Sequence, residues 1–149
     1  MIIHGRSEQQ TRTAIASPLA MIASDGFIEN GRGHPRTSGT YAKVLGRYVR
    51  DEKAVTLMDA LRRMTLEPAR RLERRTPAMA NKGRVRVGAD ADLAIFDPAT
   101  VIDRATYENA AIPSAGITYV VVGGQVVVDG GELTAARPGR AVRAPVSTR

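Results

Sequence analysis

The chain has 149 residues, of which 43% are hydrophobic and 25% are charged, and this composition is typical of a folded globular protein rather than a disordered one. It contains no cysteine, which excludes disulfide bonds and thiolate metal ligands within this chain. Residues 1–5 lack the features of a signal peptide, and no apolar stretch approaches the length of a membrane span. We therefore expect a cytoplasmic protein that does not bind membranes.

The net charge is +7, and the basic residues are scattered along the chain apart from one group of arginines. No aromatic side chains are interleaved with this group, as stacking on nucleic-acid bases would require. The group is typical of a solvated helix face whose aliphatic stems cover apolar surface. We therefore expect no nucleic-acid partner, although a basic binding module remains an alternative that salt-dependent binding would reveal. The arginines concerned are Arg62, Arg63, Arg70, Arg71, Arg74 and Arg75.

The first part of the chain has the pattern strand, helix, strand. Residues 1–4 predict a short strand, and Ser7 and Gln10 have the spacing of a capping box, which predicts a helix up to about residue 17. Pro18 ends this helix, and the apolar run 19–24 predicts a buried strand. Two strands joined by a helix form the crossover unit of a parallel sheet, so we expect an α/β fold here.

Asp25 directly follows the predicted strand and precedes Gly26, a turn residue. In α/β barrels the catalytic groups lie at the C-terminal ends of strands, which makes Asp25 a candidate catalytic residue. The alternative is that Asp25 only caps a turn. Residues 27–39 predict a loop rich in glycine and polar residues, in which His34 and Arg36 add an imidazole and a guanidinium to the candidate site.

A metal site made by this chain alone would need about three protein ligands. The available set is His4, Asp25 and His34, in which His4 at a strand end could approach Asp25 on the neighbouring strand. We favour the alternative, in which His4 is a surface or core residue. His34 would then shape the loop that presents Arg36, with Pro35 stiffening it.

Three helices are expected next in the chain. Apolar residues at helical spacing predict a helix over 41–49, and a start at Thr56 that resembles a capping box predicts another over 56–64. Pro68 fits the first turn of a further short helix that ends near residue 72. The first 76 residues therefore read as one α/β region.

The pattern changes to β after residue 76. Residues 77–82 predict a linker, and 83–88 and 91–96 predict short strands. Residues 117–128 predict a β-hairpin whose tight turn is Gly123-Gly124, because glycine adopts the positive φ angles of such turns. Two parallel strands cannot cover both faces of a sheet, so the chain reads like the end of a larger protein.

Short motifs spread over nearly the whole chain are similar to those of one enzyme family. They are Ser24-Asp25-Gly26, His34-Pro35-Arg36, Gly39-Thr40-Tyr41, VLGRYVR at 44–50, KGRV at 82–85, ADL at 91–93, Phe96-Asp97-Pro98, TVIDRATY at 100–107 and Pro138-Gly139-Arg140. On these residues the chain resembles the C-terminal portion of the N-acyl-D-amino-acid deacylases, or D-aminoacylases, of the amidohydrolase superfamily. The motifs between residues 25 and 50 are the most specific of them.

This resemblance implies a fold in two parts. Residues 1–76 would form the last βα units of an amidohydrolase-type (β/α) barrel, followed by helices, and residues 77–149 would form part of a small β-sandwich. The family's metal-binding histidines and cysteine lie on earlier barrel strands, which this chain lacks. The resemblance thus implies that the isolated chain is incomplete, and we expect it to need the missing barrel portion or to self-associate.

The resemblance also implies a reaction, namely the zinc-dependent hydrolysis of small N-acyl-D-amino acids to a carboxylate and a free D-amino acid. Asp25 would take a proton from the attacking water, lying beside the metal and binding it weakly or through water. Arg36 would bind the α-carboxylate of the substrate, and His34 would support the loop. The alternative is a non-catalytic fragment or split subunit that acts through protein contacts.

Overall fold

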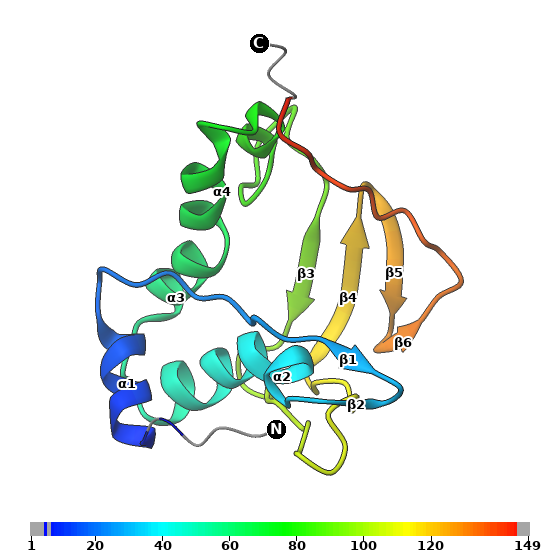
Figure 1. The fold of residues 1–149 in the computed structure, drawn as a ribbon. Helices are drawn as coiled ribbons and strands as arrows, with labels where there is room; N and C mark the ends of the chain where they lie inside the picture. The colour runs from blue at the N-terminus through cyan, green and yellow to red at the C-terminus, as the bar shows by residue number, and fades with distance from the viewer. Residues whose placement is uncertain (1–4, 6, 146–149) are drawn as a thin grey trace. The chain divides into compact units, whose positions relative to one another are not determined.

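The computed structural model describes residue 5 and residues 7–145 (Figure 1). The chain divides into two compact units, each considered by itself below. Unit 1 consists of Met1–Ala60 and Asp97–Gly116, and unit 2 of Leu61–Phe96 and Ile117–Arg149. These units are defined by packing alone, and the assignment of residues 1–76 to a barrel and 77–149 to a sandwich stays a prediction.

Unit 1 begins with helix α1, Glu8–Ala16, which confirms the helix predicted from the capping box. The Ser7 hydroxyl accepts from the Gln10 amide at 3.2 Å, and the Gln10 side chain accepts from the Ser7 amide at 2.8 Å. Arg12 Nε donates to a carboxylate oxygen of Glu52 at 3.1 Å. This ion pair ties α1 to the end of the following long helix.

The prediction of a strand over residues 19–24 is wrong. This stretch carries no strand pairing in the structure, Leu19 is 95% exposed and only Ile22 is buried. A strand needs a hydrogen-bonded neighbour, and no described residue pairs with this stretch. The predicted neighbouring strand, residues 1–4, lies outside the described residues.

The loop predicted over 27–39 contains two elements that we did not predict. Strands β1, Ile28–Glu29, and β2, Arg32–Gly33, form a short antiparallel hairpin. Its turn is Asn30-Gly31, with φ of 50° and 74°, which is the sequence and geometry of a tight hairpin turn. Helix α2, Arg36–Lys43, then begins inside the predicted loop, so Arg36 is a helix residue.

Helix α2 continues directly into η1, Val44–Asp51, a π-helix. Together they confirm the helix predicted over 41–49 and extend it at both ends. Val44 and Tyr48 from η1 are fully buried, as are Val101 and Ala110 from the segment 97–116. The core of unit 1 therefore lies between this long helix and the segment 97–116.

Helix α3, Leu57–Met64, starts as predicted at Thr56, whose hydroxyl accepts from the Asp59 amide at 3.2 Å. In unit 2, helix α4, Leu66–Glu73, contains Pro68 in its first turn, as predicted. The predicted linker holds a short 3-10 helix, η2, Pro77–Asn81. No helix of the described residues is long and apolar enough to cross a membrane.

The strand predicted over 83–88 is also wrong. Gly83 and Gly88 have φ of 67° and 80°, which are turn conformations at both ends of the stretch, and no strand is formed between them. Val85 and Val87 are 88% and 103% exposed. The alternating pattern of this stretch thus has no sheet to join among the described residues.

The rest of unit 2 is a four-stranded antiparallel sheet in the order β3-β4-β5-β6 (Figure 1). Strand β3, Leu93–Phe96, and the hairpin of β4, Ile117–Val122, with β5, Gln125–Asp129, confirm the strands predicted at 91–96 and 117–128. Gly123 and Gly124 both have positive φ, 54° and 80°, as predicted for the tight turn. The short β6, Glu132–Leu133, was not predicted.

Candidate functional site

Asp25 lies at the surface of unit 1, and its backbone is in the left-handed region with φ of 47°. Its side chain is 89% exposed. The next residue, Gly26, passes so close to Thr37 that a Cβ atom at this position would collide with the Thr37 side chain. Asp25 is therefore held next to the first turn of α2 by the close approach of two backbone segments.

Arg36 is the first residue of α2, and its guanidinium lies 3.2 Å from a carboxylate oxygen of Asp25. The arginine side chain is 46% exposed. An ion pair so open to solvent contributes little to stability, about 0–1 kcal/mol. The structure thus brings the two predicted site residues together while leaving both charged groups accessible to a ligand.

His34 caps the start of α2. Its Nδ1 accepts a hydrogen bond of 3.1 Å from the Arg36 amide, and its carbonyl accepts from the Thr37 amide at 3.0 Å. These are two of the amides at a helix start that have no partner within the helix. This contact places the His34 ring against the backbone amide of Arg36.

Tyr107 meets the other side of the His34 ring. The two rings pack edge to face with centroids 5.2 Å apart, and the tyrosine hydroxyl lies 3.4 Å from His34 Nε2. Sequence reasoning did not predict this contact, because 73 positions separate Tyr107 from His34. The only sequence signal was its place in the family-like run 100–107.

A cavity of about 1010 Å³ opens beside Arg36. The hairpin β1–β2 and the start of α2 provide its walls, and these elements lie side by side in unit 1 (Figure 1). Arg32 and Arg36 contribute positive charge to the lining, and Glu29 contributes a carboxylate. The volume of the cavity suits a small ligand, and its two arginines suit an anionic group on that ligand. The lining residues are Gly26, Phe27, Glu29, Asn30, Arg32, Gly33, His34 and Arg36.

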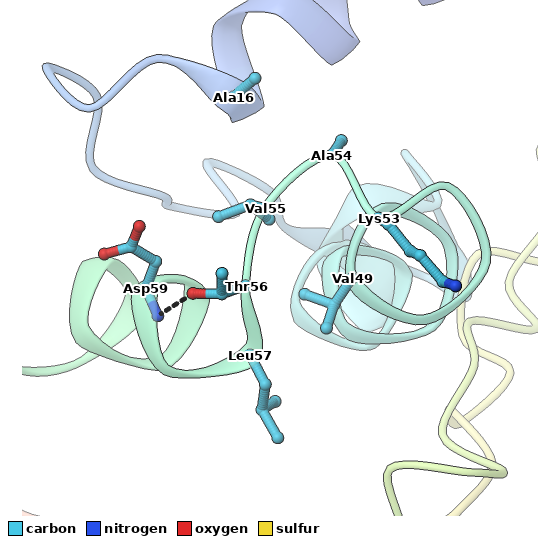
Figure 2. Close-up of a pocket in the computed structure, with 8 residues that line it drawn as sticks. All are labelled: Ala16, Val49, Lys53, Ala54, Val55, Thr56, Leu57 and Asp59. Carbon is cyan, nitrogen blue, oxygen red and sulfur yellow. Dashed lines mark hydrogen bonds between the residues drawn. The ribbon is translucent and has the colours of Figure 1, made fainter.

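A second, smaller pocket of about 450 Å³ lies between the end of α1 and the segment that links η1 to α3 (Figure 2). Most of its lining is aliphatic. Its two charged residues, Lys53 and Asp59, point away from each other in Figure 2. This pocket therefore gathers no group of side chains that could carry out a reaction. The lining residues are Ala16, Val49, Lys53, Ala54, Val55, Thr56, Leu57 and Asp59.

The long helix that carries Arg36 is fastened by a cluster of charged groups at its other end. Tyr48 is buried and its hydroxyl donates to the Glu8 carboxylate; burial first, and then this hydrogen bond, raise the pKa of Tyr48. Arg47 Nε donates to Glu52 at 2.7 Å, which lowers the pKa of Glu52. These shifts belong to an ion-pair network that supports the helix, and they do not mark a second site.

The described residues do not by themselves make a metal centre. None of them form a group of three or more His, Cys, Asp or Glu side chains placed to hold an ion. Of the possible set His4, Asp25 and His34, the first lies outside the described residues. A catalytic zinc needs about three protein ligands, so the described part of the chain does not fit this ion without further residues.

The sequence profile of the amidohydrolase family matches residues 8–128. The chain belongs to the amidohydrolase family. This match covers the candidate site, the long helix, the segment 97–116 and most of the sheet. The resemblance stated from the motifs is therefore confirmed.

Among curated proteins, this amidohydrolase chain is 38% identical over 146 residues to the N-acyl-D-glutamate deacylase of Alcaligenes xylosoxydans xylosoxydans, which covers 98% of the chain and 29% of that protein. It is 38% identical over 133 residues to the D-aminoacylase of the same organism, covering 89% of the chain and 26% of that protein. The chain thus spans less than a third of the length of these relatives, and it matches a portion of them.

Solved structures give the same assignment for the amidohydrolase chain. The N-acyl-D-glutamate deacylase of Bordetella bronchiseptica, in complex with zinc and a phosphonate inhibitor that mimics the tetrahedral intermediate of its reaction, is 39% identical with a TM-score of 0.78. The match covers 93% of this chain and 28% of that one. A D-aminoacylase crystal structure is 38% identical with a TM-score of 0.79, covering 87% and 26%.

Proposed function

We propose that this chain is the C-terminal part of a zinc-dependent N-acyl-D-amino-acid deacylase. The reaction is the hydrolysis of the acyl amide, in which water adds to the carbonyl carbon and the C–N bond breaks, giving a carboxylate and a free D-amino acid. One observation carries the proposal at the level of residues. The guanidinium of Arg36 lies 3.2 Å from a carboxylate oxygen of Asp25, and both groups are accessible beside a cavity of about 1010 Å³.

Asp25 is proposed as the proton acceptor for the attacking water. Its carboxylate is largely exposed, so a ligand in the site can reach it. A carboxylate is a suitable acid–base group because it can take a proton from the nucleophile and later return it to the leaving amine. The strained backbone of Asp25 supports a functional role, since left-handed non-glycine residues cluster at functional sites.

Arg36 is proposed as the anchor for the α-carboxylate of the substrate. A planar guanidinium binds a carboxylate through two parallel hydrogen bonds, which fixes the orientation of the substrate as well as its charge. In the free molecule this guanidinium pairs with Asp25. A bound carboxylate would compete for Arg36 and leave the Asp25 carboxylate available to the reacting water.

Zinc is proposed for the complete protein because the relative from Bordetella bronchiseptica binds zinc. The described residues do not form a complete site for this ion, so its ligands would come from other parts of the protein. This chain is thus proposed to associate with the missing barrel portion or with another copy of itself. Residues 1–76 are proposed to end the barrel and 77–149 to contribute to a β-sandwich, in a cytoplasmic protein.

A second candidate function is a non-catalytic subunit that acts through protein contacts. Two observations favour it, namely the lack of a metal-binding group among the described residues and the exposure of large apolar side chains such as Leu19 and Val87. It differs from the first candidate in a simple way. A contact subunit would leave hydrolysis unchanged when Asp25 or Arg36 is replaced.

The experiment is an assay of the complete protein against N-acetyl derivatives of D- and L-amino acids, with and without a zinc chelator. The proposal expects hydrolysis of D-derivatives only, lost on removal of zinc and restored when zinc is added. Equal hydrolysis of both enantiomers, or activity that survives complete zinc removal, would contradict it.

A further inference from the structure

The segment 97–116 contacts the first turn of α2 at several points. Ser38 Oγ donates to the Ala110 carbonyl at 2.7 Å, and Ser114 Oγ donates to the Ser38 carbonyl at 2.8 Å. Asp103 lies against Gly39, where a Cβ atom would come within 2.8 Å of the Asp103 Cβ. With the contact between Tyr107 and His34, this segment holds the turn that begins with Arg36.

The contacts of His34 determine which ring nitrogen carries the proton in its neutral form. The Arg36 amide donates to Nδ1 at 3.1 Å, so Nδ1 must offer a lone pair. The proton is then on Nε2, which donates toward the Tyr107 hydroxyl oxygen at 3.4 Å. Tyr107, His34 and the Arg36 amide thus form one directional chain of hydrogen bonds.

We propose that Tyr107 is a positioning residue for the carboxylate-binding arginine. It holds the His34 ring in one orientation, and the ring in turn fixes the amide, and with it the starting direction, of Arg36. This inference rests on the proposed function of Arg36. It adds a residue from a distant part of the chain, which reaches the site through its contact with His34.

We expect loss of the Tyr107 hydroxyl to have only a modest effect on substrate binding, because its hydrogen bond to His34 is long and Tyr107 is 47% exposed. Two-point binding of a carboxylate depends on the direction of the guanidinium, and a small displacement weakens it. For Tyr107→Phe we expect about a fivefold rise in KM for an N-acetyl-D-amino acid, equivalent to about 1 kcal/mol, with kcat nearly unchanged. The α-amide of the same substrate should show little change in KM.

The test compares the wild-type complete protein with Tyr107→Phe, Arg36→Lys and the double variant, using the best D-substrate of a panel of N-acetyl-D-amino acids that have no side-chain carboxylate. Tyr119→Phe is the matched control, because Tyr119 is a half-exposed tyrosine on β4 in unit 2. If Tyr107 acts through Arg36, its replacement has no further effect in the Arg36→Lys background. Additive losses in the double variant would overturn the proposal.

A second readout does not depend on activity. Hydrogen exchange of the Arg36 amide should be faster in Tyr107→Phe than in wild type, while amides near the C-terminal end of η1 exchange at the wild-type rate. In the Tyr119→Phe control, the Arg36 amide should remain as protected as in wild type. Unchanged exchange at Arg36 would overturn the inference even if KM rises. If the wild-type protein hydrolyses no N-acyl-D-amino acid, the proposed function fails, and the exchange data still decide whether Tyr107 holds Arg36.

Discussion

At Asp25 the backbone adopts a left-handed conformation, which costs most non-glycine residues about 1–2 kcal/mol. Aspartate and asparagine tolerate it best, because their short polar side chains can bond locally. Asn at this position would therefore keep the backbone while removing the charge. Asp25→Asn is for this reason a clean probe of the carboxylate.

For Arg36 we expect the change Arg36→Lys to raise KM for an N-acyl-D-amino acid by about tenfold to a hundredfold. Lysine keeps the positive charge but cannot reproduce the planar fork that binds two carboxylate oxygens. The measurement is steady-state kinetics on one substrate with a free α-carboxylate and on its α-amide. The amide should lose much less, and equal losses for both would show that Arg36 serves the loop and not the ligand.

The candidate site could be predicted only in part from its residues. Asp25 was found from its position after an apolar run and Arg36 from the family-like motif, and the structure places both side chains together. Tyr107 could not be found in this way. Its contact with His34 depends on the path of the segment 97–116 across α2, and no local pattern encodes a contact over 73 positions.

Among the elements, the long helix α2–η1 meets the segment 97–116 at Gly46. A Cβ atom at this position would lie 2.5 Å from the Val101 carbonyl oxygen and 2.7 Å from a methyl carbon of Ile102. We expect Gly46→Ala to destabilise unit 1 by about 1–3 kcal/mol, because overpacking outweighs the better helix propensity of alanine. The measurement is the free energy of unfolding in denaturant.

Gly139→Ala is the control for this prediction, because no heavy atom lies within 4 Å of the Cβ it would add. It should change the free energy of unfolding by less than about 0.5 kcal/mol. If Gly46→Ala proves as harmless as this control, the segment 97–116 does not pack on the helix as described.

The hairpin β4–β5 is joined to the end of η2 by Asp92. One carboxylate oxygen accepts from Lys82 Nζ at 2.6 Å and the other accepts from the Gly123 amide at 2.8 Å. The bond to Lys82 first, and then the bond to Gly123, lower the pKa of Asp92 below its ordinary value of 3.8. The same pairing raises the pKa of Lys82 above 10.5.

These directions define a pH window for stability. A lowered carboxyl pKa stabilises the fold above pH 3.8 and this contribution is lost as the pH falls through the folded pKa, whereas the Lys82 contribution is lost only above pH 10.5. We expect Asp92→Asn to cost about 0.5–1 kcal/mol at pH 7, since the pair is partly exposed. Unfolding curves of the variant and wild type should converge at acid pH, once Asp92 is protonated in the folded state as well. A difference that persists there would show that charge is not the cause.

Local signals predicted the elements that local chemistry stabilises. The capping box at Ser7 gave the correct start of α1, and Gly123-Gly124 gave the correct turn of the β4–β5 hairpin. The strands predicted over 19–24 and 83–88 failed for one shared reason. An apolar or alternating stretch becomes a strand only where another strand pairs with it. None of the described residues pairs with 19–24 or with 83–88 as a strand.

At the scale of the whole molecule, the chain spans 29% of the N-acyl-D-glutamate deacylase of Alcaligenes xylosoxydans xylosoxydans. We expect the isolated 149-residue chain to hydrolyse no N-acetyl-D-amino acid even with added zinc, because its described residues lack a three-ligand group. Exposed apolar side chains such as Leu19, Val85 and Val87 should also make it self-associate. Hydrolysis assays and sedimentation test both points, and a monomer with ordinary turnover would refute them.

Asp25 is proposed as the proton acceptor of a D-aminoacylase-type hydrolysis. The most direct test is kcat for an N-acetyl-D-amino acid in the complete protein with the change Asp25→Asn, at unchanged zinc content and unchanged unfolding midpoint. Asparagine keeps the shape of the side chain but cannot take the proton, so kcat should fall by about 10²- to 10⁴-fold with a much smaller change in KM. A variant that folds, keeps its zinc and retains near-normal kcat would contradict the assignment of Asp25.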